Sequence, residues 1–253
     1  MDKKQKKILE MNKDAWEKVA ETFAGGLYLP AWGVFQELRD VNLLGDIKGK
    51  TFLEIGYGSG HSAQYLLNNG AKKVYGIDIS EEQRKLATKL NSEYIKEGKV
   101  TFNVSPMEDR ITLPEKVDIV FSVYAIGWTT SPEITFKNIK SYLKPGGRFI
   151  WSWEHPFYSR VETENNKLVM DKSYVKECAK LVFKWSGSDG AYIQHRKIST
   201  WINELVKAGF EIENMYEPSP EVFAEEHMDK KRYYSKFRAS YIPSSIVFDC
   251  RLK

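Results

Sequence analysis

The spacing of hydrophobic residues changes along the chain near residue 46. Before that point, apolar side chains recur every three or four positions, as on one face of a helix, at Ile8, Met11, Ala15 and Val19. Gly25 and Gly26 would end this opening helix, and we expect a second short helix over about 32–41, after Pro30. The amino-terminal segment therefore predicts a helical cover rather than part of a sheet.

Five short runs rich in Val, Ile and Phe follow, at residues 51–55, 73–79, 100–104, 117–123 and 148–153. Such continuous apolar runs are typical of parallel strands buried on both faces. Helix signals lie between them: Ser80 to Gln83 matches a capping box, and Ser131 precedes a proline suited to the first helical position. Strands that alternate with helices predict a doubly wound α/β sheet with right-handed crossovers.

Residues 157–194 depart from this rhythm. An alternating run at 181–185, a Gly-Ser-Asp-Gly turn at 187–190 and a further short run predict a hairpin insertion. We then expect a helix over 199–208 and strands over 210–216 and 245–251, with the last pair antiparallel. The interpretation is one domain over 1–253, divided into a cover (1–45), a cofactor-binding core (46–156), the insertion (157–196) and a carboxyl-terminal helix and strands (197–253).

Composition supports a globular chain and excludes several classes of protein. The chain has 253 residues, of which 42% are hydrophobic and 28% charged. The longest nearly apolar stretch, 119–128, is shorter than the roughly 20 residues that span a bilayer, and no signal peptide is legible. Cys178 and Cys250 lie far apart without nearby ligands, so neither a metal site nor a disulfide framework is expected. We expect a cytoplasmic protein with no membrane partner.

Net charge points to no particular partner. The 38 basic residues exceed the 34 acidic ones only slightly, for a net charge of +4. The strongest basic and aromatic cluster is 229–238, whose tyrosines and arginines could stack on and pair with single-stranded RNA. Acidic residues precede it closely, at Glu221, Glu225, Glu226 and Asp229. The mixture favours a solvated helix over a nucleic-acid surface.

The sharpest motif is a glycine-rich loop between the first strand and the helix that begins near His61. It runs Glu54-Ile55-Gly56-Tyr57-Gly58-Ser59-Gly60, and glycines at alternate positions let the backbone approach a ligand beside a helix N-terminus. The second strand ends at Asp78, where a carboxylate would meet a ribose. A dinucleotide fingerprint would require glycine in place of His61.

The loop and two later signatures, at 118–122 and 143–147, carry a family resemblance. From about Trp16 to Lys253 the chain resembles the class I S-adenosylmethionine-dependent methyltransferases, specifically the methyltransferase type 11 small-molecule group. The resemblance implies a seven-stranded, Rossmann-like α/β fold with an antiparallel last strand. It also implies S-adenosylmethionine as cofactor and transfer of its methyl group to an O or N atom of a small metabolite.

The resemblance also implies which residues bind the cofactor. Asp78 would bind both ribose hydroxyls and Ile79 would pack on the adenine. The family usually has Gly-Asp-Ala after the third strand, whereas this chain has Ser105-Pro106-Met107, so the Met107 N–H with Glu108 or Asp109 would bind the adenine instead. The residues expected around the methionine half and the sulfonium are Glu54, Gly56, Tyr57, Gly58, Gly60 and Ser122.

We expect the methyl acceptor to bind beyond the fourth and fifth strands, among aromatic residues that include Trp185. The candidate substrate-binding residues are Tyr28, Trp32, Tyr124, Trp128, His155, His195 and Arg196. His155 titrates near neutrality and could take a proton from the acceptor; equally, it could be a structural residue that fixes its loop. Arg196 could pair with an acidic substrate group or brace the hairpin. Residues 1–35 and 157–194 would cover the site.

Two other functions stay open from the sequence. The enzyme could methylate RNA or protein, or the chain could bind S-adenosylmethionine without catalysis. Neither the identity of the acceptor nor the oligomeric state follows from the residues.

Overall fold

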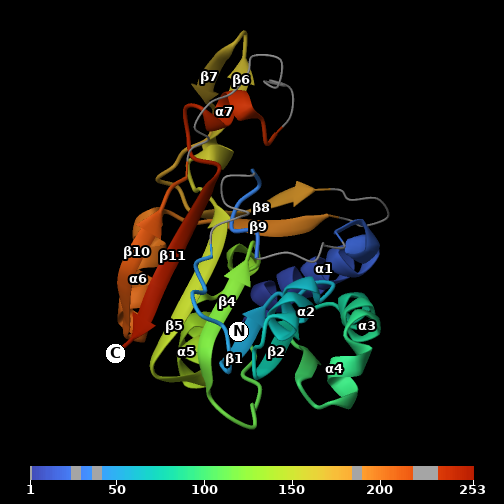
Figure 1. The fold of residues 1–253 in the computed structure, drawn as a ribbon. Helices are drawn as coiled ribbons and strands as arrows, with labels where there is room; N and C mark the ends of the chain where they lie inside the picture. Colours follow the sequence, from blue (N-terminus) through green and yellow to red (C-terminus); the bar gives the residue numbers. More distant parts are fainter. Residues whose placement is uncertain (1, 24–29, 36–41, 184–189, 219–232) are drawn as a thin grey trace.

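The fold is a central seven-stranded sheet flanked by helices, in a computed structural model that describes residues 2–23, 30–35, 42–183, 190–218 and 233–253 (Figure 1). The strand order is β10-β11-β5-β4-β1-β2-β3. Strands β1 to β5 run parallel, and β11 is antiparallel to both β5 and β10. The strands are β1 (Thr51–Ile55), β2 (Lys73–Asp78), β3 (Val100–Val104), β4 (Val117–Val123), β5 (Leu143–Glu154), β10 (Phe210–Tyr216) and β11 (Ser245–Leu252). The doubly wound sheet expected from the sequence is confirmed, including its antiparallel end.

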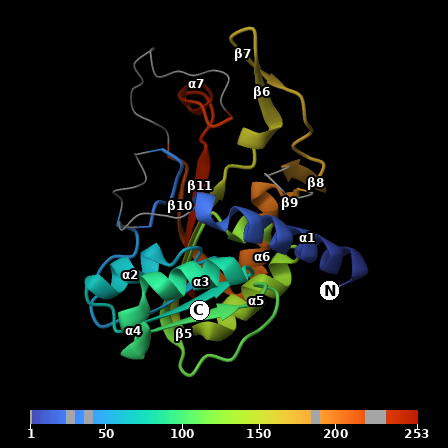
Figure 2. The same ribbon diagram turned by 90° about the vertical axis from the view of Figure 1, so that its right-hand side faces the viewer.

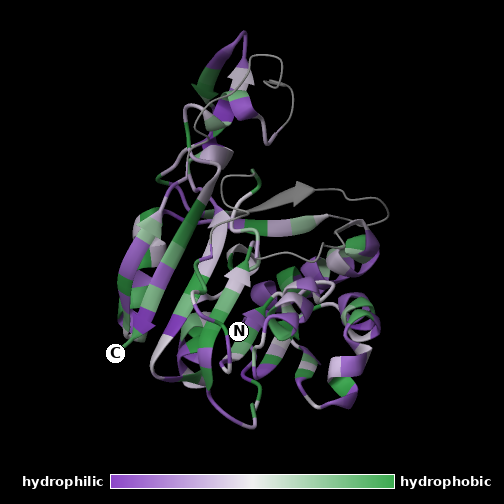
Figure 3. Ribbon diagram, in the orientation of Figure 1, coloured by the Kyte–Doolittle hydropathy of each residue, from purple (hydrophilic) through white to green (hydrophobic). Residues whose placement is uncertain are grey.

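Hydrophobic residues gather along the central strands and are covered on both faces (Figure 3). One core cluster joins the sheet to Phe136, Ile139, Trp201 and Leu205 of α5 and α6. The other joins it to Ala63, Leu66 and Leu67 of α2 and to the segment before β1. The helices are α1 (Lys3–Val19), α2 (His61–Asn68), α3 (Glu81–Leu90), α4 (Ser92–Lys96), α5 (Pro132–Tyr142), α6 (Ile198–Ala208) and α7 (Lys236–Ala239), and short 3-10 turns are η1 (Ala20–Phe23), η3 (Ile126–Trp128) and η4 (Tyr158–Arg160).

The predicted helix starts are correct in position but differ in detail. The Ser80 hydroxyl accepts a hydrogen bond from the Gln83 N–H at 3.1 Å, which caps α3. The Gln83 side chain does not reach back, because its Nε2 donates to the Ala20 carbonyl instead. Pro132 opens α5 as expected, whereas the Ser131 hydroxyl accepts from Gln5 of α1 rather than capping α5. Both departures arise because α1 competes for the capping groups.

The insertion is two hairpins rather than one. Strands β6 (Val161–Glu164) and β7 (Lys167–Met170) form the first, and β8 (Cys178–Phe183) and β9 (Ala191–His195) form the second. Asn165 and Asn166 join β6 to β7 with φ values of 47° and 60°, the left-handed backbone that asparagine tolerates in tight hairpins. The expected turn at 187–190 lies largely outside the described residues.

Helix α1 crosses the edge of the sheet at which the parallel strands end (Figure 2). Three polar contacts attach it: Gln5 to Ser131 before α5, Asn12 to the backbone of Tyr192 in β9, and Glu17 to the start of α3. The expected opening helix is therefore confirmed. The expected second helix is not: residues 32–35 are non-helical, and 36–41 lie outside the described part. Within that described part, every helix is too short or too polar to cross a membrane.

Candidate active site

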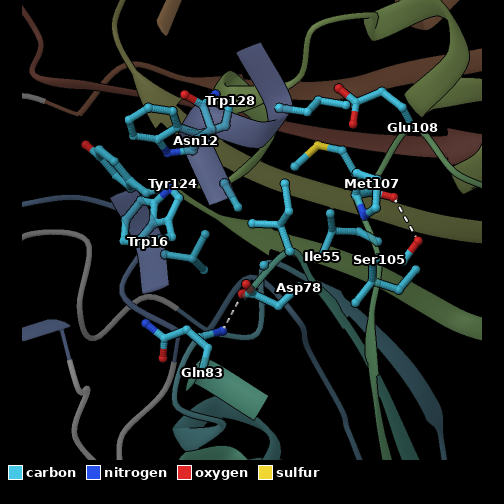
Figure 4. Close-up of a pocket in the computed structure, with 18 residues that line it drawn as sticks. Asn12, Trp16, Ile55, Asp78, Gln83, Ser105, Met107, Glu108, Tyr124 and Trp128 are labelled. Carbon is cyan, nitrogen blue, oxygen red and sulfur yellow. Dashed lines mark hydrogen bonds between the residues drawn. The ribbon is translucent and has the colours of Figure 1, made fainter. Parts of the chain in front are cut away.

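A cavity of about 320 Å³ lies where the strand order reverses, at the carboxyl ends of β1, β2 and β4 (Figure 4). Open α/β sheets bind ligands at this position because the loops after neighbouring strands diverge there. The segments that line it follow β1, β2, β3 and β4, and α1 closes it from above. The lining residues are Leu9, Asn12, Trp16, Ile55, Gly56, Gly58, Ile77, Asp78, Ile79, Gln83, Ser105, Pro106, Met107, Glu108, Val123, Tyr124, Ala125 and Trp128.

The glycine loop leaves space for a ligand at one of its three glycines. A side chain on Gly56 would lie 2.2 Å from Ala125 Cβ, and one on Gly60 would lie 2.8 Å from Ala87 Cβ, so packing requires both. A Cβ on Gly58 would meet nothing nearer than Gln83 Oε1 at 4.0 Å. Gly58 therefore borders the cavity, and its φ of 52° is one that other residues adopt at a cost.

Asp78 joins the second strand to this loop. Its Oδ2 accepts from the Gly58 N–H and its Oδ1 from the Ser80 N–H, each at 3.0 Å. Burial raises the pKa of Asp78 to about 6, although these backbone donors oppose the shift. Each oxygen keeps a lone pair, so the carboxylate suits a pair of ribose hydroxyls.

The cavity also fits an adenine ring near β3. Ile79 and Met107 line it, and the Met107 N–H makes no hydrogen bond within the described residues. Glu108 lines it too, but its Oε1 already accepts from the Thr129 hydroxyl at 2.9 Å and the Thr130 N–H at 2.6 Å. Glu108 thus ties the loop after β4 in place through Oε1, while its Oε2 is buried without a hydrogen-bond partner among the described residues. The Met107 N–H is the donor available to an adenine nitrogen, and Glu108 Oε2 is an acceptor available to the adenine amino group.

Four of the residues expected at the cofactor lie behind the cavity wall rather than in it. Tyr57 packs on Phe102 with ring centroids 4.7 Å apart, and the Ser122 hydroxyl donates to the Ile55 carbonyl at 2.8 Å. Glu54 is 3% exposed, burial raises its pKa, and its Oε2 has no partner among the described residues. Gly60 is the N-cap residue of α2. Ser122 thus bonds the backbone under the loop and does not line the cavity.

The sequence interpretation expected the amino-terminal segment to cover the site but did not name the residues of α1 that line the cavity. Leu9, Asn12 and Trp16 line the cavity, together with Gln83 of α3. Asn12 is 2% exposed, with its amide bonded in both directions to Tyr192: Nδ2 donates to the carbonyl at 3.0 Å and Oδ1 accepts from the N–H at 2.7 Å. A buried amide on the apolar face of a helix was the available signal, because such a group requires partners.

A second cavity of about 440 Å³ adjoins the first and shares Trp16, Tyr124 and Trp128 with it. Tyr124 has a φ of 53°, the strained left-handed backbone that is rare for a bulky residue, at the end of β4. Its hydroxyl bonds Ser245, and burial raises its pKa. The other lining residues are Val34, Trp153, Glu154, Pro156, Ser159, Arg160, Ile193, Gln194, His195, Arg196, Trp201, Tyr233 and Tyr234.

His155, the expected base, does not line either cavity. Its Nδ1 accepts from the Phe157 N–H at 3.2 Å and its Nε2 contacts Glu217 Oε1 at 2.8 Å, so both ring nitrogens hold the loop. Burial also lowers the pKa of His155. Its neighbour Glu154 lines the second cavity instead, where it accepts from the Tyr234 hydroxyl at 2.8 Å, and burial raises its pKa.

The other expected substrate residues divide between the cavity, the core and the part outside the described residues. Tyr124, Trp128, His195 and Arg196 line the second cavity. Trp32 is fully buried against Phe121 on the α2 face of the sheet, so it is a core residue and its expected contact with substrate is corrected. Tyr28 and Trp185 lie outside the described residues.

The described end of the basic cluster, 233–238, is not a solvated helix. Tyr233 and Tyr234 line the second cavity, and Arg238 is 2% exposed, paired with Glu162 and packed over the Tyr158 ring. Arg238 thus faces inward, whereas Tyr233 is 38% exposed and keeps part of its ring at the surface. Nor do the described residues bring together three His, Cys, Asp or Glu side chains that could hold a metal ion.

Comparisons with known proteins agree with this geometry. A model of the methyltransferase domain family matches residues 53–151. An uncharacterized protein of Haemophilus influenzae is 31% identical over 188 residues, which cover 70% of this chain and 74% of that protein. CRG1 of Saccharomyces cerevisiae, a probable S-adenosylmethionine-dependent methyltransferase, is 33% identical over 109 residues, which cover 42% of this chain and 37% of that protein.

The fold has the same kind of relatives. A crystal structure from Listeria monocytogenes, assigned to the S-adenosylmethionine-dependent methyltransferases, superposes with a TM-score of 0.68 at 27% identity, and covers 83% of this chain and 94% of its own. With the glycine loop, Asp78 and the seven-stranded sheet, these matches show that the chain belongs to the class I S-adenosylmethionine-dependent methyltransferases and uses S-adenosylmethionine as its cofactor.

Proposed function

We propose that this enzyme transfers the methyl group of S-adenosylmethionine to an oxygen or nitrogen atom of a small metabolite held in the second cavity. The observation that supports this most is the shared wall. Trp16, Tyr124 and Trp128 line both cavities, so a cofactor bound over Gly58 and Asp78 and an acceptor among the aromatic residues would meet there. Alignment of donor and acceptor can supply about 7 to 11 kcal/mol of the barrier.

The chain's own residues have three tasks in this reaction. When bound, S-adenosylmethionine supplies a methyl carbon whose bond to the positively charged sulfur breaks as the acceptor's lone pair attacks, which leaves neutral S-adenosylhomocysteine. Asp78 and the Gly58 backbone orient the ribose, and the aromatic side chains orient the acceptor and exclude water. Glu154 accepts the proton that a hydroxyl or ammonium acceptor loses, since a raised pKa brings a carboxylate closer to the useful range of a base.

The size and lining of the second cavity favour a small acceptor. About 440 Å³ lies within the range of roughly 300 to 1,000 Å³ that small-molecule sites occupy. A protein or RNA acceptor would need an outward-facing surface beside the cavity. The aromatic and basic residues described at 233–238 instead form part of the cavity wall and its support.

The experiment is methyl transfer from isotope-labelled S-adenosylmethionine into fractionated cell extract. We expect the label in the small-molecule fraction and not in the protein or RNA fractions. Native mass spectrometry of the same preparation would identify any acceptor that copurifies. Label confined to protein or RNA would overturn the small-metabolite proposal, and bound cofactor without any transfer would overturn catalysis itself.

A further inference from the structure

We infer that the methyl acceptor joins an apolar, ring-sized body to an acidic group, a carboxylate or a phosphate, and that Arg196 binds this group with help from Arg160. The inference rests on the proposed function, because it names the class of molecule that the second cavity takes.

Arg196 is a buried cation in the cavity wall that the described residues do not neutralise. It is 6% exposed, and its Nη2 donates to the Thr129 carbonyl at 2.7 Å and to Gln194 Oε1 at 2.9 Å. Its Nη1 is buried without any hydrogen-bond partner among the described residues. Both acceptors of Nη2 are neutral, so the positive charge is held in place but not paired.

The position of the guanidinium group is fixed by its surroundings. The Arg196 Cζ lies 5.0 Å from the centroid of the Trp201 ring, which supports the planar group by a cation–π contact. Burial lowers the pKa of Arg196 to about 10. The negative charges of Glu177, Glu133 and Glu108 oppose this shift, but none of these carboxylates lies within ion-pair distance of Arg196. A buried cation costs several kcal/mol unless it is paired, so the arrangement favours a bound anion.

Arg160 gives the same cavity a second unpaired cation. It is 7% exposed, and its Nε and Nη2 donate to the neighbouring Ser159 hydroxyl at 3.2 and 3.0 Å. The described residues offer it no carboxylate within ion-pair distance. Its charge lowers the pKa of both Glu154 and His195, so it lies near each of them.

The remaining charges of the wall do not cancel these two. Among the described residues that line this cavity, Glu154 is the one acidic residue. Its carboxylate already accepts hydrogen bonds from the Tyr233 and Tyr234 hydroxyls. Burial lowers the pKa of His195, which favours the neutral ring. Its Nε2 lies 2.9 Å from the Tyr174 carbonyl, so Nε2 is the ring nitrogen that bears the hydrogen of this neutral form. The described wall thus has two cations and one hydrogen-bonded carboxylate, which favours an acidic ligand.

The rest of the cavity favours an apolar body. Trp128 and Trp153 meet edge to face with centroids 5.9 Å apart, and Trp16 meets Trp128 in the same way at 5.5 Å. These rings line the same cavity as the polar groups of β9 and its neighbours. Flat aromatic walls suit ring-sized ligands, and arginine suits the two acceptor oxygens of an acid.

The test measures binding of matched probes to protein saturated with S-adenosylhomocysteine, by calorimetry. The probes are benzoate against benzamide, phenylacetate against phenylacetamide, and phenyl phosphate against phenol, so the pairs separate a carboxylate from a phosphate. We expect the charged member of at least one pair to bind about tenfold tighter than its neutral partner, since hydrogen bonds to charged groups are worth about 1.5 to 3 kcal/mol. Arg196→Gln should remove that preference, and Arg160→Gln should weaken it.

Arg251→Gln is the matched control, because Arg251 lies at the opposite end of the sheet and pairs with Glu213 on the surface. It should keep the preference of the wild type. The inference would be overturned if the wild type preferred the charged probe in none of the three pairs, or if the preference survived in both Arg196→Gln and Arg160→Gln. In either case a normal affinity for S-adenosylhomocysteine would leave the proposed function intact. Wild-type protein that fails to bind S-adenosylhomocysteine would overturn both.

Discussion

We expect Asp78 to make cofactor binding depend on pH. Because burial raises its pKa to about 6, the carboxylate is ionised above that pH and becomes protonated as the pH falls through it. A protonated carboxyl loses acceptor capacity toward the ribose hydroxyls and Gly58, so affinity for S-adenosylhomocysteine should fall below about pH 6. Calorimetry between pH 5 and 8 measures this.

The matched variants for this prediction are Asp78→Asn and Asp46→Asn. The first should weaken binding by about tenfold to a hundredfold and make it independent of pH over this range. The second changes an exposed aspartate and should behave as the wild type. If Asp78→Asn kept the pH dependence, another group would control binding.

Glu154 and its neighbour His155 should respond oppositely to mutation. Glu154→Gln preserves shape but removes the proton acceptor, so we expect methyl transfer to slow by about a hundredfold or more while cofactor affinity stays constant. His155→Asn should instead lower the melting temperature with little change in the rate, because His155 bonds Glu217 and the Phe157 N–H. Single-turnover kinetics and thermal unfolding separate the two effects. A slow His155→Asn variant beside a normal Glu154→Gln variant would restore the histidine as base.

Local motifs predicted backbone segments that line the first cavity, whereas the second cavity gathers residues from distant segments. The motif from Gly56 to Asp78 predicted that the glycine loop and the end of the second strand lie side by side. This arrangement depends only on backbone segments that are close in the sequence. At the end of β5, adjacent side chains point to opposite sides, so the choice between Glu154 and His155 depended on register that the sequence does not contain. Trp32 was misplaced for a similar reason, because composition does not say which face of a sheet a tryptophan covers.

One carboxylate at the end of helix α1 joins it to α3. Glu17 accepts from the Glu81 and Glu82 N–H groups at 2.8 Å each and from the Ser80 hydroxyl at 3.1 Å, so it occupies the N-terminus of α3. Glu17→Gln should lower the free energy of unfolding by about 1 to 2 kcal/mol and speed hydrogen exchange in α1. Denaturant titration and exchange mass spectrometry measure these changes.

Glu10→Gln serves as the control for Glu17, since Glu10 is exposed on the same helix. It should leave stability and exchange unchanged. Equal effects of the two substitutions would mean that Glu17 does not hold α1, and that its apolar face and the contacts of Gln5 and Asn12 hold it instead.

At the scale of elements, periodic patterns predicted α1, α6 and the strands of the central sheet, β10 and β11 included. Continuous apolar runs and helical spacing are properties of short stretches, so they are legible in sequence. The β6–β7 hairpin was missed because its two central asparagines carry no glycine signal. The attachment of α1 to α3 and β9 joins residues far apart in the chain, and such pairings are not encoded by any local pattern.

The two segments that cover the site, α1 and the hairpin that contains β9, should respond to a ligand together. Asn12 of α1 is bonded in both directions to Tyr192 of β9, and both elements line the cavities. S-adenosylhomocysteine, which would contact α1 directly, should therefore slow hydrogen exchange in α1 and β9 alike. In Asn12→Ala, protection should persist in α1 and be lost from β9. Asn69→Ala, at the exposed end of α2, is the control. Protection of β9 that survives in Asn12→Ala would show that the covers respond independently.

The two cavities have mostly different lining residues, which bears on how the acceptor specificity of this enzyme could be engineered or could evolve. In the proposed arrangement the cofactor would rest on the ends of β1 to β4 and the acceptor on covers supplied by the insertion and by 233–234. Among the described lining residues, three are common to both cavities. A library restricted to Arg160, Ile193, Gln194 and Tyr233 would sample new acceptors while donor recognition stays constant. Randomising Trp16, Tyr124 or Trp128 would change both at once, so most productive variants should retain these three side chains.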